Sequence, residues 1–126
     1  MPVRLLNSAV LKWPDRQKVI NEARKWARMV GGNNKNIQQI LCFGSICTGF
    51  WGVGSDFDVL IILNESDFPY SYRSSIYSEY LSIISIPVDI LVYTTEEMDE
   101  MSKKRPRFLC EIDKSALVLF QKEKDG

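Results

Sequence analysis

The sequence contains no histidine, and this absence excludes two common kinds of active site. A Ser-His-Asp triad and a Cys-His pair both need an imidazole as the general base. A zinc centre is also disfavoured, because Cys42, Cys47 and Cys110 provide no second closely spaced pair of ligands. An odd number of cysteines cannot form a complete set of disulfides, so we expect free thiols and a cytoplasmic protein.

Long hydrophobic runs are also missing from the 126 residues. No apolar stretch approaches the roughly 18 residues that a membrane-spanning helix needs, and the first residues lack the apolar region of a signal peptide. The apolar share of 45% and the charged share of 25% are ordinary for a folded domain. We therefore expect one domain over residues 1–126, with an N-terminal arm at 1–13, a solvated tail at 121–126 and no contact with a membrane.

The chain has no net charge, although its charges are unevenly distributed. Residues 37–101 carry a net charge of −9, while residues 1–36 carry +6 and residues 102–126 carry +3. The zero total argues against direct binding of nucleic acid, which usually requires an excess of basic residues. An acidic middle segment attracts metal cations, and basic flanks suit an anion or an acidic partner. Solvated helix faces would explain the same distribution and stay open as an alternative.

Periodic patterns along the chain predict alternating helices and strands. Apolar residues at helical spacing predict a first helix from about 15 to 30, which ends at the two glycines and two asparagines of 31–34. The other expected elements are strands at 37–43, 56–63, 88–93 and 116–120, helices at 72–85 and 95–104, and a turn at 108–112. Thr95 is the expected N-cap of the helix that Pro106 ends. This order predicts an α/β fold with a small mixed sheet of about four strands and flanking helices.

Two aspartates stand at the start of the second expected strand. Asp56 and Asp58 are two residues apart, so their side chains point to the same face, and their charges repel unless a cation lies between them. Asp89 enters the third expected strand at a comparable place, and adjacent strands would bring all three carboxylates together. Such a group suits Mg²⁺ and the two-metal form of phosphoryl transfer. Capped loops and solvated strand ends are the alternative.

Gly44 and Ser45 directly follow the first expected strand. Backbone N–H groups in a glycine turn that opens a helix bind anions, and a serine hydroxyl adds a donor. An ordinary turn with a serine cap is the alternative. Two other phosphate motifs are excluded, because no lysine between Lys35 and Lys103 completes a Walker A loop, and Phe57 stands where a dinucleotide fingerprint needs its third glycine.

Gly44-Ser45, ten further residues and then Asp56-x-Asp58 resemble the GS-x10-DxD signature of the minimal nucleotidyltransferases, which belong to the DNA polymerase β-like nucleotidyltransferase superfamily. Asp89, in the stretch PVDILVY, is similar to the third carboxylate of that family. The resemblance implies a single nucleotidyltransferase-fold domain that transfers AMP from Mg-bound ATP to an acceptor hydroxyl and releases pyrophosphate. It also implies that Asp56, Asp58 and Asp89 hold two Mg²⁺ ions and that Gly44 and Ser45 bind the phosphates.

Members of this family that stand alone at this size resemble the antitoxin half of HEPN/minimal-nucleotidyltransferase pairs. Such members add AMP to a tyrosine of the HEPN toxin. The resemblance therefore implies a protein adenylyltransferase that acts as an antitoxin, with a HEPN-type toxin as partner and with homo- or hetero-oligomers left open. The alternative is a catalytically inactive protein that neutralises a partner by contact. Thr48 keeps this alternative open, because many relatives carry arginine at that position.

Overall fold

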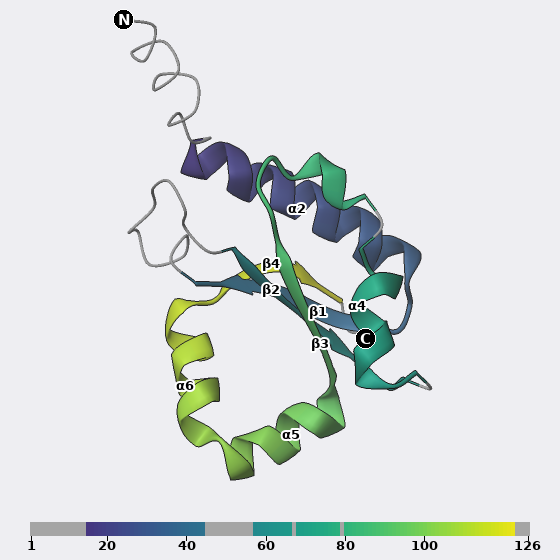
Figure 1. Ribbon diagram of the computed structural model, residues 1–126, viewed down its shortest axis with the longest axis vertical. Helices are drawn as coiled ribbons and strands as arrows, with labels where there is room; N and C mark the ends of the chain where they lie inside the picture. The colour runs from purple at the N-terminus through teal and green to yellow at the C-terminus, as the bar shows by residue number, and fades with distance from the viewer. Residues whose placement is uncertain (1–14, 45–56, 67, 79, 123–126) are drawn as a thin grey trace, which may run out of the picture.

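The computed structural model describes residues 15–44, 57–66, 68–78 and 80–122 (Figure 1). Its elements in chain order are α2 (Arg16–Asn33), β1 (Ile37–Phe43), β2 (Asp58–Leu63), α4 (Tyr70–Ile76), the 3-10 turn η1 (Leu81–Ile83), β3 (Asp89–Thr94), α5 (Thr95–Lys104), α6 (Pro106–Ser115) and β4 (Leu117–Gln121). The predicted α/β fold with four strands is confirmed.

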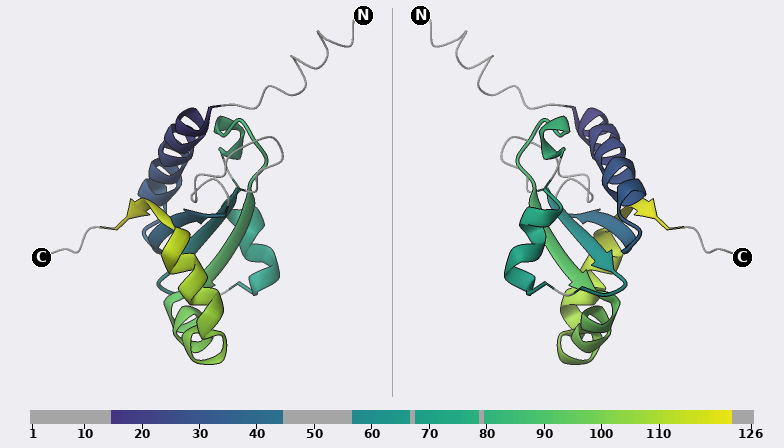
Figure 2. Two further views of the ribbon diagram at one scale, coloured as in Figure 1. Left: turned by 90° about the vertical axis from the view of Figure 1, so that its left-hand side faces the viewer. Right: turned by 90° about the vertical axis from the view of Figure 1, so that its right-hand side faces the viewer.

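The four strands form one mixed sheet in the order β3-β2-β1-β4. β2 and β3 are parallel, whereas β1 is antiparallel to both β2 and β4. Val59 and Ile61 of β2 pack in one core with Trp26 of α2, while Leu60 packs on the opposite face with Ile112 of α6. Figure 2 shows α4 at the β3 edge of the sheet, on the side of the molecule away from β4. Helices therefore flank the sheet, as predicted.

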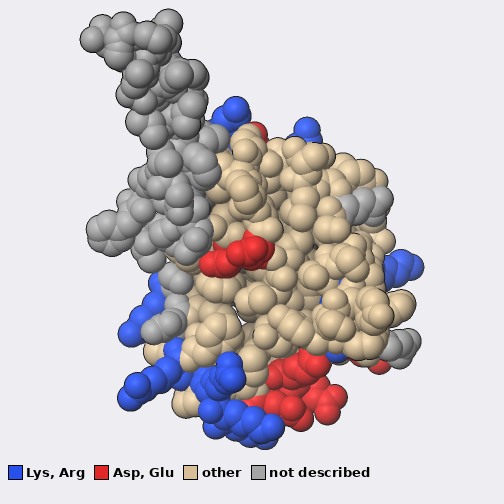
Figure 3. Space-filling model, viewed as in Figure 1, with Lys and Arg blue, Asp and Glu red and all other residues tan. Residues whose placement is uncertain are grey.

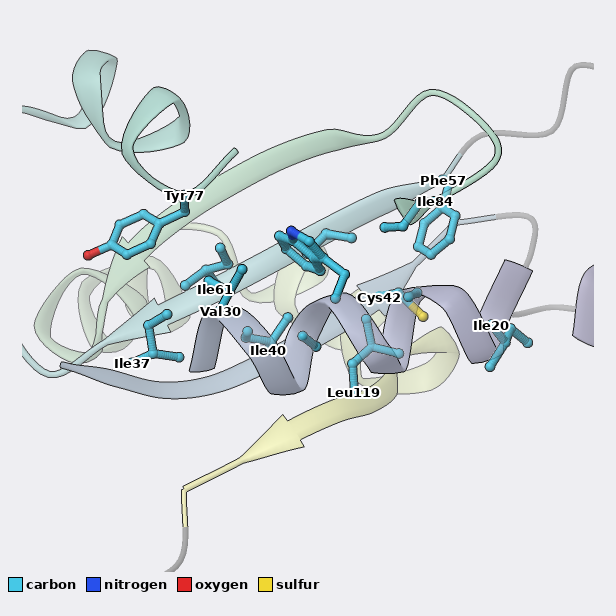
Figure 4. Packing of buried hydrophobic residues seen from close by; sticks show 14 of the residues in the cluster. Ile20, Val30, Ile37, Ile40, Cys42, Phe57, Ile61, Tyr77, Ile84 and Leu119 are labelled. Carbon is cyan, nitrogen blue, oxygen red and sulfur yellow. The ribbon is translucent and has the colours of Figure 1, made fainter. Parts of the chain in front are cut away.

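The larger core lies between α2 and the sheet, and Figure 4 shows its packing. The expected end of the helix at about residue 30 is three residues too early, because α2 continues through Gly31 and Gly32 to Asn33; its end still falls within the predicted stretch 31–34. Gly31 is buried, and a Cβ atom there would lie only 2.7 Å from the ring of Phe120 in β4. Gly31 thus allows the close approach of α2 to β4, while Asn34 is the C-cap.

The prediction of one continuous helix over 72–85 is also wrong. α4 ends at Ile76, and only the short turn η1 follows. Ser75 and Ser78 each donate a hydroxyl hydrogen bond to the carbonyl three residues earlier, at 2.8 and 2.9 Å, and such bonds compete with the helical ladder. Tyr80 then adopts a left-handed φ of 66°, which a right-handed helix cannot contain.

The N-cap of the helix after β3 lies one residue earlier than predicted. Thr94, rather than Thr95, is the N-cap: its hydroxyl accepts from the Glu97 N–H at 3.1 Å, and the Glu97 carboxylate accepts from the Thr94 N–H at 2.8 Å. The helix ends before Pro106, as predicted, but Pro106 also begins α6, where only a turn over 108–112 was expected. Proline fits the first position of a helix, since its missing N–H would have no partner there.

The strand predictions are close to the observed limits. β1 has the predicted limits, and β3 and β4 each begin and end one residue later than predicted. β2 begins at Asp58, and the expected start at Asp56 lies outside the described residues, as does the arm at 1–13. The predicted tail begins inside β4, whose last residue is Gln121.

Two of the three cysteines lie in the described part of the chain. Cys42 is buried in the core and Cys110 is exposed, and neither forms a disulfide, as expected; Cys47 lies outside the described residues. None of the described helices is long and apolar enough to cross a membrane.

Candidate functional site

β2 and β3 bring two of the predicted site aspartates together. Asp58 and Asp89 are register partners in the parallel strand pair, and the Asp89 N–H donates to the Phe57 carbonyl at 3.1 Å. By strand alternation, Asp58 shares a face with Leu60 and Asp89 shares a face with Leu91, and this is the face of the core that includes α6. Asp58 is half-buried and Asp89 is exposed. The prediction that these two strands are neighbours is confirmed.

Gly44 lies at the same end of the sheet. It follows Phe43, which is the register partner of Asp58 in the antiparallel pair of β1 and β2. Gly44 has a φ of 103°, in the left-handed region that only glycine adopts without strain. The chain therefore turns beside the carboxylates, where the predicted phosphate cradle would begin. Ser45 and Asp56 lie outside the described residues, so their roles stay predictions.

A hollow of about 620 Å³ opens beside both aspartates. Its walls come from the sheet, from α4 and from the chain between α4 and β3, and its lining residues are Phe43, Asp58, Ser74, Ser75, Ser78, Leu81, Val88, Asp89, Ile90 and Leu91. Ser75 and Ser78 donate their hydroxyl hydrogens to carbonyls, so their oxygens are left as acceptors. Carboxylates and acceptor hydroxyls together suit a ligand that brings cations or donors. Figure 3 shows a small acidic patch on this face of the molecule, separate from a larger acidic area lower down.

The oxygen donors beside the hollow suit Mg²⁺. Asp58 and Asp89 supply carboxylates, and the described lining of the hollow contains no cysteine or lysine. Facing positions on adjacent strands are about 5 Å apart, so two carboxylates there are close enough to bind one cation. Within the described ranges, no three His, Cys, Asp or Glu side chains are grouped so that they could hold a metal. A metal site at these two aspartates would need a further ligand such as Asp56, which lies outside the described residues, so the site stays a prediction.

Arg73 fixes α4 against the edge of the sheet. Its side chain is buried; Nη1 donates to the Val92 carbonyl at 3.3 Å and Nε donates to the Phe68 carbonyl at 3.0 Å. Its two terminal nitrogens bind the two carboxylate oxygens of Glu97, at 2.5 and 3.2 Å. This hydrogen bonding to the ionised form lowers the pKa of Glu97. Arg73 thereby positions the helix that carries the serines of the hollow.

The sequence offers a partial signal for Arg73 and none for the serines. Arg73 is the only basic residue in the acidic segment 37–101, and an isolated cation there points to a specific partner. Ser74, Ser75 and Ser78 form no motif, because their place beside the hollow depends on how α4 packs against β3.

Comparison with known proteins decides the family. The family model described as "Polymerase beta, Nucleotidyltransferase" matches residues 28–125. The chain belongs to this nucleotidyltransferase family. The matched region contains all four strands and both aspartates beside the hollow. No curated protein matches this chain in sequence.

Solved structures show the same nucleotidyltransferase fold. A candidate nucleotidyltransferase from Sulfolobus solfataricus has 20% sequence identity and a TM-score of 0.61, with 86% of each chain covered. A toxin–antitoxin structure with AMP-PNP has 20% identity and a TM-score of 0.54, covering 84% of this chain and 76% of that one. A mutant of the toxin–antitoxin MntA-HpeT has 19% identity and a TM-score of 0.50, covering 90% of this chain and 77% of that one. At these identities the likeness establishes the fold.

Proposed function

We propose that this chain is a Mg²⁺-dependent nucleotidyltransferase that transfers AMP from ATP to an acceptor hydroxyl. The observation that carries the proposal is the register pairing of Asp58 with Asp89 at the mouth of the hollow. Carboxylate oxygens at facing strand positions are close enough to bind one ion, and they are the ligands that Mg²⁺ prefers. Membership of the nucleotidyltransferase family supports the same chemistry.

Each predicted site residue has a place in this reaction. Asp56, Asp58 and Asp89 would hold two Mg²⁺ ions, which neutralise the phosphate charge and activate the acceptor oxygen when bound. The turn at Gly44 and Ser45 would bind the outer phosphates through backbone N–H groups. The acceptor oxygen bonds to the α-phosphorus as the bond to the β-phosphate breaks; pyrophosphate leaves and the hydroxyl proton passes to solvent.

We further propose that the acceptor is a tyrosine hydroxyl of a HEPN-type toxin and that this chain acts as its antitoxin. Two solved structures of the same fold are described as toxin–antitoxin structures, one of them with AMP-PNP. The hollow beside Asp58 and Asp89 contains acceptor groups but little positive charge, which suits an incoming hydroxyl on a protein better than a polyanion such as RNA.

Intact-mass measurement tests this proposal. The chain is incubated with Mg²⁺, ATP and the product of the gene adjacent to its own, and the masses of both proteins are then measured. Added AMP on the partner, absent with EDTA and absent when the acceptor tyrosine is changed to phenylalanine, is the expected result. A partner that is bound and neutralised but gains no mass would contradict transfer and support the alternative of neutralisation by contact.

A further inference from the structure

The helix α4 is turned with its charged residue inward and its apolar residues outward. Arg73 is the buried residue of this helix, with only 6% of its surface exposed. Tyr72 and Ile76 are 63% and 40% exposed. A helix on a folded domain normally buries its apolar side chains and exposes its charges. This reversal costs hydrophobic stabilisation, so it calls for a function on the outer side of α4.

Polar contacts hold α4 in this orientation. Arg73 binds the Phe68 carbonyl, the Val92 carbonyl at the edge of β3, and the carboxylate of Glu97. Tyr70 adds a ring stack on Tyr93, with 5.0 Å between the centroids. Because these contacts hold the helix, the remaining apolar side chains of α4 do not need to pack in the core.

The outer side of α4 and the loops next to it carry exposed apolar side chains, together called the α4 face here. It consists of Phe68, Tyr72, Ile76 and Tyr80, and their exposed fractions are 56%, 63%, 40% and 41%. Large exposed apolar patches mark interaction sites. Tyrosine is a frequent anchor of protein interfaces, because its side chain loses little conformational entropy on binding.

An acidic border lies at the Phe68 end of the α4 face, where Glu65 lines one hollow with Phe68 and another with Glu96 and Glu100. Glu65, Glu96 and Glu100 line a small hollow together with Arg73 and Glu97, whose charges balance each other. The three remaining carboxylates give this border a negative charge. The larger acidic area low in Figure 3 lies on this side of the molecule. An occupant of the α4 face therefore needs basic side chains around an apolar centre.

A second copy of this chain is a poor occupant. A two-fold contact through the α4 face would bring the same surface of each copy together, and neither copy would offer the acidic border a basic partner from this face. A different protein with basic residues supplies that partner. The location also favours such a partner, because Ser74, Ser75 and Ser78 lie just inward of the α4 face and line the hollow beside Asp89.

We propose that the α4 face docks the protein partner through a segment that carries basic residues around an apolar centre, and thereby delivers its acceptor hydroxyl to the hollow beside Asp58 and Asp89. This inference rests on the proposed function and adds the surface and the chemistry of recognition. The polar anchor of Arg73 and the outward apolar side chains are then two parts of one arrangement.

The test measures affinity for the product of the gene adjacent to that of this chain. Tyr72→Ser and Ile76→Ser should each weaken binding at least tenfold, because they remove exposed apolar contacts without disturbing the core. Glu96→Lys with Glu100→Lys should slow association and reduce its dependence on salt. The control, Lys25→Glu on the exposed side of α2, should bind like the wild type. Stabilisation by Mg-ATP should be the same in all these variants.

Three results would overturn the docking proposal: unchanged affinity in the α4 variants, no binding of this partner by the wild-type chain, or self-association that the same substitutions abolish. Failure of the proposed function looks different. In that case the partner binds through the α4 face, and the variants weaken it, but Mg-ATP adds no AMP to it.

Discussion

Asp58 and Asp89 face each other across the parallel pair of β2 and β3 at the end of the sheet where Gly44 turns the chain. The sheet hydrogen bonds hold their backbones at this spacing whether or not a ligand is present. The two carboxylates are therefore held close enough in the folded chain to bind one cation.

The first prediction follows from this spacing. Mg²⁺ should raise the melting temperature of the wild type, because a ligand that binds only the folded state stabilises it. Asp89→Asn should lose this shift and, in EDTA, should be as stable as the wild type or more stable. Asp99→Asn, a change on the exposed surface of α5, is the control that should keep the full Mg²⁺ shift. An unchanged Mg²⁺ shift in Asp89→Asn would count against a metal site here.

The second prediction concerns the two helical glycines. Gly31→Ala should destabilise the fold by about 1–3 kcal/mol, because the new methyl group would overlap the ring of Phe120. Gly32→Ala is the matched control, since no atom lies within 4 Å of its new Cβ, and it should stabilise the helix by about 0.5–1 kcal/mol. Denaturant unfolding measures both changes. Equal effects of the two substitutions would contradict the close packing of α2 on β4.

The third prediction concerns the ion pair that anchors α4. Arg73→Met should lower the free energy of unfolding by about 2 kcal/mol, because hydrogen bonds to charged groups contribute roughly 1.5–3 kcal/mol. A double-mutant cycle with Glu97→Gln should show that much of this loss is shared between the two residues. Lys103→Met, which breaks the exposed pair with Asp99, should cost less than about 0.5 kcal/mol. Additive effects of Arg73→Met and Glu97→Gln would argue against the pair.

The fourth prediction is a dependence of stability on pH. Bonding to Arg73 lowers the pKa of Glu97 below its ordinary value of 4.5, so the folded state binds this proton more weakly than the unfolded state. The resulting stabilisation is present above that ordinary value and is lost as the pH falls through the lowered pKa. The melting temperature of Glu97→Gln should therefore fall less between neutral and acid pH than that of the wild type. Parallel curves for the two proteins would contradict this role of Glu97.

Local patterns predicted most of the fold because they coincide with tertiary packing in most of the chain. β1 lies in the middle of the sheet, and its apolar run alone gave its limits. The prediction for the segment after Ile76 is wrong, because Ser75 and Ser78 bond to nearby carbonyls and Tyr80 takes a left-handed conformation. Neither feature can be read from the spacing of apolar residues.

The candidate site likewise has a part that could be predicted from the sequence and a part that could not. The proximity of Asp58 and Asp89 was predictable, since strand alternation and one neighbouring pair of strands suffice to bring them together. The inward orientation of Arg73 and the serines beside the hollow depend on how α4 lies against β3. That packing depends on the ion pair between Arg73 and Glu97, which are 24 residues apart in the chain.

The most direct test of the central claim is the rate of AMP transfer by single carboxylate variants. The wild type, Asp58→Asn and Asp89→Asn are incubated with Mg²⁺, the partner protein and ATP labelled on its α-phosphate, after circular dichroism has confirmed that all three are folded. The account predicts labelled partner with the wild type and a loss of more than a hundredfold in rate with each variant. Transfer within tenfold of the wild type in both folded variants would contradict it.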